Sequence, residues 1–125
     1  VDFRAHGSDI DKAAAELTLE NARRAGVLKY VSAKAGDIHN FSLPEERCLT
    51  VTNPPYGERL LDVKAAEELY AVMGNRFNPG YGRKYFIISP DDEFERFFGR
   101  TADKRRKLYN GMLKCQLYMY FKNNN

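Results

Sequence analysis

The sequence predicts an α/β fold: an open, mostly parallel sheet with helices on both faces and an antiparallel hairpin at the C-terminal end. Strand-like and helix-like segments alternate along the 125 residues, in the order strand, helix, strand, strand, helix, strand, helix, hairpin. Such alternation is typical of strands joined by crossover helices. The length suits one ordinary domain. Because ligands of such sheets bind beyond the carboxyl ends of the strands, the residues after each strand are the first candidates for function.

Residues that typically cap helices or form turns support this order of elements. Two helices are flanked by aspartates that can cap them and by glycines that can end them, namely Asp9 or Asp11 with Gly26, and Asp91 or Asp92 with Gly99. Asn110-Gly111 between two apolar runs predicts a tight hairpin. The expected elements are strands at 3–8, 29–33, 47–52 and 84–90, helices within 8–26, 60–77 and 91–99, and two strands around 110–111.

The charge balance permits nucleic-acid binding without requiring it. The chain has 20 basic and 17 acidic residues, a net charge of +3. Positive charge concentrates in the C-terminal half, where Arg100 precedes the run KRRK at 104–107 and GYGRK spans 80–84. This cluster is either an ordinary solvated surface or a patch that faces RNA.

Cysteine and histidine usage argues against a metal centre. Cys48 and Cys115 lie far apart, outside any metal-ligand spacing, and the chain has only two histidines. Both thiols fall in apolar runs, so we expect small, reduced core residues of a cytoplasmic protein. No apolar run approaches the length that spans a membrane, so we expect neither metal nor membrane among the partners.

Two aspartates lie just past predicted strands. Asp9 precedes a helix, where a carboxylate can either accept both hydroxyls of a ribose or cap the helix. Asp37 can accept a proton from an adenine amino group, with Ile38 as part of an apolar wall for the ring, or it can be an ordinary turn residue. Spacing alone leaves both choices open.

The unit Asn53-Pro54-Pro55-Tyr56 follows the strand at 47–52 and is harder to explain as a turn. The two prolines have no N–H, so they stiffen the loop and leave it rich in acceptors. The Asn53 side-chain carbonyl and the backbone carbonyls then face outward beside the flat ring of Tyr56. This combination suits a planar substrate that donates two protons, such as an exocyclic amine of a base or an amide.

The segment TNPPYGERL resembles the motif of S-adenosylmethionine-dependent amino methyltransferases with a Rossmann-like fold. Together with GSDIDKAAAELTLENARRAGV and KRRKLYNGMLKCQLYMYF, it is similar to bacterial proteins described as N6-adenine-specific DNA methylases. It is also similar to their relatives, the guanine-N2 methyltransferases of large-subunit ribosomal RNA. The resemblance covers nearly the whole chain and implies S-adenosylmethionine as cofactor and ribosomal RNA as partner.

The resemblance also implies roles for individual residues. Asp9, with Ile10, contacts the cofactor ribose, and Asp37, with Ile38, holds the adenine. In the NPPY motif, Asn53 and the Pro54 carbonyl orient the target amine, Pro55 keeps the loop rigid, and Tyr56 stacks on the flipped base. No nucleophilic side chain is needed, because the amine attacks the sulfonium methyl directly and catalysis is mainly positioning.

One part of the family pattern is absent from the sequence. The strand and glycine-rich turn that cradle the methionine end of the cofactor should precede Asp9, where only eight residues exist. In the family's fold this strand lies between the strands that end at Asp9 and Asn53. We therefore expect residues 1–125 to be the C-terminal part of a methyltransferase catalytic domain, inactive when isolated.

Other targets remain open at this point. Adenine in DNA is the nearest alternative, because the NPPY motif presents the same acceptors to either amine, and glutamine amides of proteins are a third. A noncatalytic RNA-binding fragment, resting on the basic residues at 100–107, is the alternative from a different class.

Overall fold

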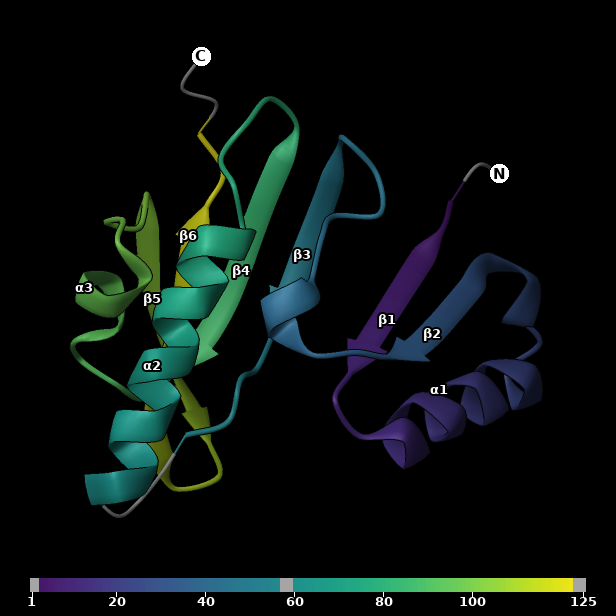
Figure 1. The fold of residues 1–125 in the computed structure, drawn as a ribbon, viewed down its shortest axis with the longest axis horizontal. Helices are drawn as coiled ribbons and strands as arrows, with labels where there is room; N and C mark the ends of the chain where they lie inside the picture. The colour runs from purple at the N-terminus through teal and green to yellow at the C-terminus, as the bar shows by residue number, and fades with distance from the viewer. Residues whose placement is uncertain (1–2, 57–59, 123–125) are drawn as a thin grey trace. The chain divides into compact units, whose positions relative to one another are not determined.

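The computed structural model describes residues 3–56 and 60–122 (Figure 1). The chain divides into two compact units, Val1–Phe41 and Ser42–Asn125, and each is described by itself. The strands and helices, in chain order, are β1 (Ala5–Asp9), α1 (Lys12–Arg24), β2 (Val31–Ala35), β3 (Cys48–Thr52), α2 (Leu60–Arg76), β4 (Arg83–Ser89), α3 (Phe94–Phe98), β5 (Lys104–Asn110) and β6 (Leu113–Tyr120).

The first unit is a two-stranded parallel sheet with one helix. β1 pairs with β2, and α1 packs against both strands through its buried Ala15 and Ala22. The cap of α1 is Asp11, whose side chain accepts the Ala13 N–H at 2.9 Å, so the alternative in which Asp9 caps this helix is wrong. Gly26 follows the helix with a φ of +77°, as its punctuation predicts.

The second strand begins two residues later than expected. Lys29 and Tyr30, expected to start this strand, belong instead to a 3₁₀ turn at Leu28–Tyr30. The Tyr30 N–H bonds back to the Val27 carbonyl at 2.9 Å, so this N–H is not available to a sheet. β2 therefore spans Val31–Ala35.

The second unit contains a four-stranded sheet in the order β3-β4-β6-β5. β3 and β4 are parallel, whereas β6 is antiparallel to both β4 and β5. The expected α/β fold with an antiparallel C-terminal hairpin is confirmed, but the strands are not mostly parallel: the described residues form a parallel pair of strands and a larger, mixed sheet. The cause is the hairpin, because its second strand inserts between β4 and β5. Among the described residues, β1 pairs only with β2 and β3 only with β4.

Helices α2 and α3 cover one face of this sheet, as Figure 1 shows. The core beneath them is aromatic: the rings of Phe77 and Tyr85 stack with centroids 5.0 Å apart, and those of Phe94 and Tyr118 lie 4.6 Å apart. Each such pair adds roughly 0.5–1.5 kcal/mol beyond the area that it buries. Burial raises the pKa of Tyr118 to about 12, with nearby acidic groups adding to the effect.

The two helices approach closely at Gly74. A Cβ atom built on this glycine would overlap the backbone carbonyl of Phe98, so only glycine fits α2 at this contact with α3. α3 itself ends at Gly99, with a φ of +91°, as predicted. The start of α3 differs from the prediction: Glu93 is at the cap position, and Asp91, two residues before it, accepts the Glu93 N–H at 2.8 Å.

Arg100 is half-buried against the aromatic core and does not belong to the basic surface in which the sequence placed it. Its Nη2 donates to the Phe77 carbonyl at 2.5 Å, and its guanidinium lies 4.7 Å from the Phe98 ring centroid and 5.5 Å from that of Tyr120. Burial lowers the pKa of Arg100, with the nearby tyrosines opposing the shift. The guanidinium thus closes one end of the aromatic core.

The opposite face of the four-stranded sheet carries apolar residues that α2 and α3 do not cover. Leu49 and Val51 of β3 alternate with inward-facing neighbours and expose 59% and 64% of their surface. The cysteines differ in a similar way: Cys115 is buried as expected, but Cys48 is only half-buried, and both are free thiols.

Residues 3–56 and 60–122 contain neither a helix suited to span a membrane nor a cluster of metal-binding side chains. None of the helices there is both long and apolar enough to cross a membrane. Among the same residues, no three His, Cys, Asp or Glu side chains are grouped as they would be to hold a metal ion.

Candidate active site

The two cofactor-binding pairs that the resemblance implies lie together at one edge of the first unit. β1 and β2 are parallel, and Asp9 faces Ala35, so both strands end at this edge. The Gly36 N–H donates to the Asp9 carbonyl at 2.9 Å, which holds the chain leading to Asp37 against the end of β1. Both carboxylates are exposed, Ile10 exposes 76% of its surface, and Ile38 is half-buried.

Each carboxylate is oriented by its own loop. Asp9 Oδ1 accepts the Asp11 N–H at 2.9 Å, which fixes its side chain at the strand end. Asp37 Oδ1 accepts the His39 N–H at 2.9 Å and lies 2.6 Å from His39 Nδ1. These hydrogen bonds, the backbone one first, lower the pKa of Asp37, so its carboxylate is ionised at neutral pH. An ionised carboxylate can accept protons from amino and hydroxyl groups.

In the second unit, the NPPY residues follow directly after β3. Pro54 is buried, Asn53 and Pro55 are exposed, and Tyr56 is half-buried. None of the peptide bonds that the structure describes is cis, so the stiffness of this loop comes from the two fixed proline φ angles. The remainder of the segment TNPPYGERL at 57–59 lies outside the described residues.

The hairpin tip lies beside this motif, which sequence reasoning did not foresee. Asn110 Nδ2 donates to Tyr56 Oη at 3.4 Å, although 53 residues separate them along the chain. The Asn110-Gly111 signal predicted a tight hairpin, but the two central residues of the turn are Gly111 and Met112, because Asn110 pairs with Leu113; Gly111 has a positive φ of 64°. Its position was not predictable, because that depends on how β6 pairs with β4.

The structure thus brings the proposed site residues together in two groups. Asp9, Ile10, Asp37 and Ile38 share an edge of the first unit, and Asn53 to Tyr56 end a strand of the second. In both units these residues lie at the carboxyl ends of parallel strands, where α/β sheets bind ligands.

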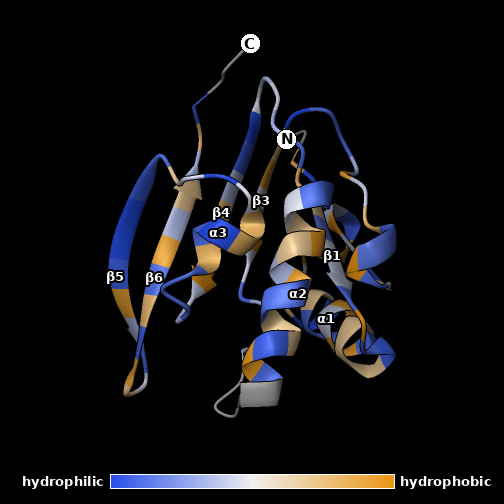
Figure 2. Cartoon of the chain, turned by 60° about the vertical axis from the view of Figure 1, so that its left-hand side comes forward, coloured by the Kyte–Doolittle hydropathy of each residue, from blue (hydrophilic) through white to orange (hydrophobic). Residues whose placement is uncertain are grey.

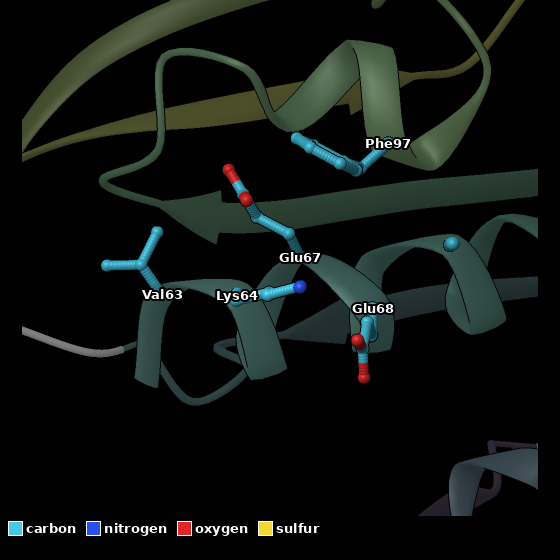
Figure 3. Close-up of a pocket in the computed structure, with 6 residues that line it drawn as sticks. Val63, Lys64, Glu67, Glu68 and Phe97 are labelled. Carbon is cyan, nitrogen blue, oxygen red and sulfur yellow. The ribbon is translucent and has the colours of Figure 1, made fainter. Parts of the chain in front are cut away.

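A separate surface hollow of about 390 Å³ lies between α2 and α3 and contains none of these residues (Figure 3). It is lined by Val63, Lys64, Glu67, Glu68, Ala71 and Phe97. The Glu67 side chain extends from α2 toward the segment before α3, and its hydrogen bond to Asp91 raises the pKa of the Glu67 carboxyl. The hollow is open to solvent, with charged groups along one helix.

Comparisons with known proteins identify the family. A family model described as "RMKL-like, methyltransferase domain" matches residues 1–119. Ribosomal RNA large subunit methyltransferase K/L of Shewanella amazonensis is 37% identical over 116 residues, which cover 92% of this chain and 16% of that protein. The chain therefore spans a small part of the length of this relative.

Solved structures agree with the family model. The crystal structure of a possible methylase from Clostridium difficile 630 matches with a TM-score of 0.90 at 39% identity, covering 100% of this chain and 33% of that one. The crystal structure of SMU.472 complexed with SAH matches with a TM-score of 0.87 at 41% identity, covering 97% of this chain and 32% of that one. Because the family model covers nearly the whole chain, the protein belongs to the family of RMKL-like methyltransferase domains.

Proposed function

We propose that the complete protein is an S-adenosylmethionine-dependent methyltransferase that modifies an exocyclic amine of a nucleobase, guanine N2 of large-subunit ribosomal RNA. The observation that carries the proposal is the Asn53-Pro54-Pro55-Tyr56 unit at the carboxyl end of β3, in a chain of a methyltransferase family. The K/L enzyme of Shewanella amazonensis, named for ribosomal RNA, supports the choice of substrate.

In the second unit, the NPPY motif orients the amine. The Asn53 side-chain carbonyl and the Pro54 backbone carbonyl accept its two protons, which turns the nitrogen lone pair outward. Pro54 and Pro55 offer no competing N–H, and the ring of Tyr56 stacks on the base once the base has left its helix. The nitrogen forms a bond to the methyl carbon while the methyl–sulfur bond breaks, and the amine proton passes to water. The rate therefore depends on positioning and not on a nucleophilic side chain.

The first unit fits the nucleoside part of the cofactor. Bound S-adenosylmethionine supplies an electrophilic methyl group on a sulfonium centre, and SMU.472, a relative at 41% identity, is complexed with the corresponding product SAH. The exposed carboxylate of Asp9 can accept both ribose hydroxyls, and the ionised carboxylate of Asp37 can accept an adenine amino proton. Ile10 and Ile38 provide apolar surface at the same edge.

In this proposal, residues 1–125 supply the C-terminal part of the catalytic domain, and the complete protein supplies a further parallel strand. Its support is that the described part of β1 pairs only with β2, and that of β3 only with β4, which leaves one edge of each strand without a neighbour. The turn after such a strand would hold the methionine end of the cofactor. The 125-residue chain alone is then expected to show no robust turnover.

The test uses Asn53→Ala in the complete protein, with the exposed helical Asn75 replaced by Ala as the matched control. Loss of one acceptor misplaces the amine, so we expect kcat to fall by about 100-fold or more while RNA affinity is kept. Asn75→Ala should change neither. Equal rates for Asn53→Ala and the unsubstituted protein would refute the role of the motif.

Digestion of the modified substrate identifies the base. Transfer of labelled methyl groups to ribosomal RNA, followed by nucleoside mass spectrometry, should give a guanosine methylated at N2. N6-methyladenosine in DNA would establish the nearest alternative, which the same acceptors also fit. Absence of transfer to either, with RNA binding retained, would favour the noncatalytic alternative.

A further inference from the structure

The hairpin of β5 and β6 extends past the end of the sheet that carries the NPPY motif. Ser89, the last residue of β4, pairs with Gln116 of β6, whereas β6 begins three residues earlier at Leu113. At about 3.3 Å per residue, the turn at 111–112 therefore projects roughly 10 Å beyond the carboxyl end of β4. Figure 1 shows this turn at the lower end of the sheet.

The projecting end presents apolar and aromatic side chains to solvent. Met112 exposes 99% of its surface and Tyr109 65%, with Leu108 at 37% beside them. Single exposed apolar residues are ordinary on protein surfaces, but here three lie within five positions. The neighbouring turn is also tied to the motif, because Asn110 donates to Tyr56 Oη.

The outer strand of the hairpin carries the basic residues. All seven residues of β5 are exposed, and the first four, Lys104 to Lys107, are cations. Glu95 pairs with Arg105 at 3.3 Å, whereas Lys104, Arg106 and Lys107 form no salt bridge within the described part of the chain. Figure 2 shows the hydrophilic colour of β5 giving way to hydrophobic colour toward the hairpin turn. Positive charge along β5 thus leads toward the ring of Tyr109, and the next residue, Asn110, is hydrogen-bonded to Tyr56.

We infer that the hairpin from Lys104 to Leu113 binds the single-stranded RNA that flanks the target nucleotide. The lysines and Arg106 contact phosphates, and Tyr109 with Met112 forms a platform on which a base next to the flipped one stacks. Single-stranded RNA suits this surface because stacking requires base faces that are free of a helix. The inference rests on the proposed function, since it identifies the flanking strand as part of the same substrate.

The experiment measures the affinity of the complete protein for a short, fluorescently labelled single-stranded RNA as salt is varied. Stacking on an aromatic side chain contributes about 1–3 kcal/mol per base, so Tyr109→Ala with Met112→Ala should weaken binding by about tenfold with the salt dependence unchanged. Lys104→Gln with Lys107→Gln should lower the slope of log K against log salt by about 1.4, since each single-strand phosphate contact contributes about 0.7.

The matched control is Tyr81→Ala. Tyr81 is 60% exposed, as Tyr109 is at 65%, but it precedes the amino end of β4 and is therefore at the other end of the sheet. We expect its replacement to leave the affinity within twofold. Far-UV circular dichroism checks that each variant is folded.

Several outcomes would overturn the inference. If the Tyr109/Met112 variant bound the RNA with unchanged affinity, these two side chains would not form a stacking platform. Equally tight binding of duplex RNA, or of single-stranded DNA of the same sequence, would refute the assignment to single-stranded RNA. Displacement of the RNA by an acidic peptide at similar concentration would identify a protein-binding surface instead.

The same variants separate this inference from the proposed function. Asn53→Ala should abolish methyl transfer and keep the affinity for the labelled RNA, because Asn53 is not part of the hairpin. If the unsubstituted protein transfers no methyl group and the Tyr109/Met112 variant still loses affinity, the RNA surface stands and the proposed reaction fails. If the unsubstituted protein transfers the methyl group and the Tyr109/Met112 variant keeps its RNA affinity, the proposed reaction stands and the hairpin surface fails.

Discussion

Replacing Arg100 by Met tests whether this residue belongs to the core or to the RNA-binding surface. The guanidinium donates to the Phe77 carbonyl and lies over the Phe98 and Tyr120 rings. Methionine keeps an unbranched apolar stem that can pack on the same rings, but it removes both the charge and the donor. The substitution therefore isolates the polar contribution from the packing contribution.

The magnitude follows from the two lost interactions. A hydrogen bond from a charged donor contributes about 1.5–3 kcal/mol, and a cation above an aromatic face about 0.5–2 kcal/mol. Removing a charge that burial disfavours offsets part of this loss, as the lowered pKa of Arg100 indicates. We expect a net decrease of about 2 kcal/mol in the free energy of unfolding, a large share of the roughly 5–15 kcal/mol typical of a domain.

Urea unfolding followed by circular dichroism measures the effect. With a slope of about 2 kcal/mol per M, the midpoint should fall by about 1 M. The control is Arg106→Met on the exposed strand β5, whose midpoint should change little. RNA affinity should show the reverse pattern, falling for Arg106→Met and not for Arg100→Met. If Arg100→Met kept the midpoint and lost RNA affinity, its assignment to the core would be wrong.

Two further substitutions test the packing and charge around α2. Gly74→Ala gains about 1 kcal/mol of helix propensity, but its methyl group meets the Phe98 carbonyl. We therefore expect the free energy of unfolding, measured in urea, to fall by about 1–2 kcal/mol. A more stable variant would show that the two helices separate easily. Glu67→Gln should raise the melting temperature at neutral pH and lose this advantage under acidic conditions. The hydrogen bond to Asp91 raises the pKa of Glu67 in the folded state. Glu67 therefore stabilises the fold fully below its pKa in the unfolded chain, and this stabilisation is lost as the pH rises through its pKa in the folded protein. Equal gains at both pH values would contradict this reasoning.

The parts of the fold that could be predicted are those that local chemistry determines. Gly99 ends α3 and Gly111 forms the hairpin turn, because both positions need a positive φ that glycine adopts without strain. The NPPY motif could be placed at a strand end, because two prolines cannot continue a ladder. The family could be recognised because the flanking segments match as well as the motif.

The parts that could not be predicted depend on contacts between residues distant in sequence. The antiparallel insertion of β6 between β4 and β5 decides the type of sheet, and no single segment encodes it. It also brings Asn110 to Tyr56. From the sequence, Arg100 is predicted to lie on the surface, because the aromatic rings that partly bury it come together only in the folded chain.

The sequence placed the aspartates correctly but could not choose between their roles. Asp11 caps α1, so Asp9, at the end of β1, is not the helix cap. For Asp37 both options persist together: it starts a 3₁₀ turn and still exposes its carboxylate at the site edge. A turn residue and a ligand-binding residue are thus compatible at one position.

Among the described residues β3 is an edge strand, and until the further strand proposed above pairs with it, this edge gives the two prolines of the motif a second consequence. Cys48–Thr52 is uncharged, rich in residues with high β-propensity and, among the described residues, paired on one side only. Such a segment is a template for intermolecular pairing and aggregation. Pro54 and Pro55 follow almost at once, and a strand laid along this edge cannot continue its hydrogen bonds past them. The prolines that shape the acceptor site therefore also act as gatekeepers, which limit how far misassembly can extend along β3.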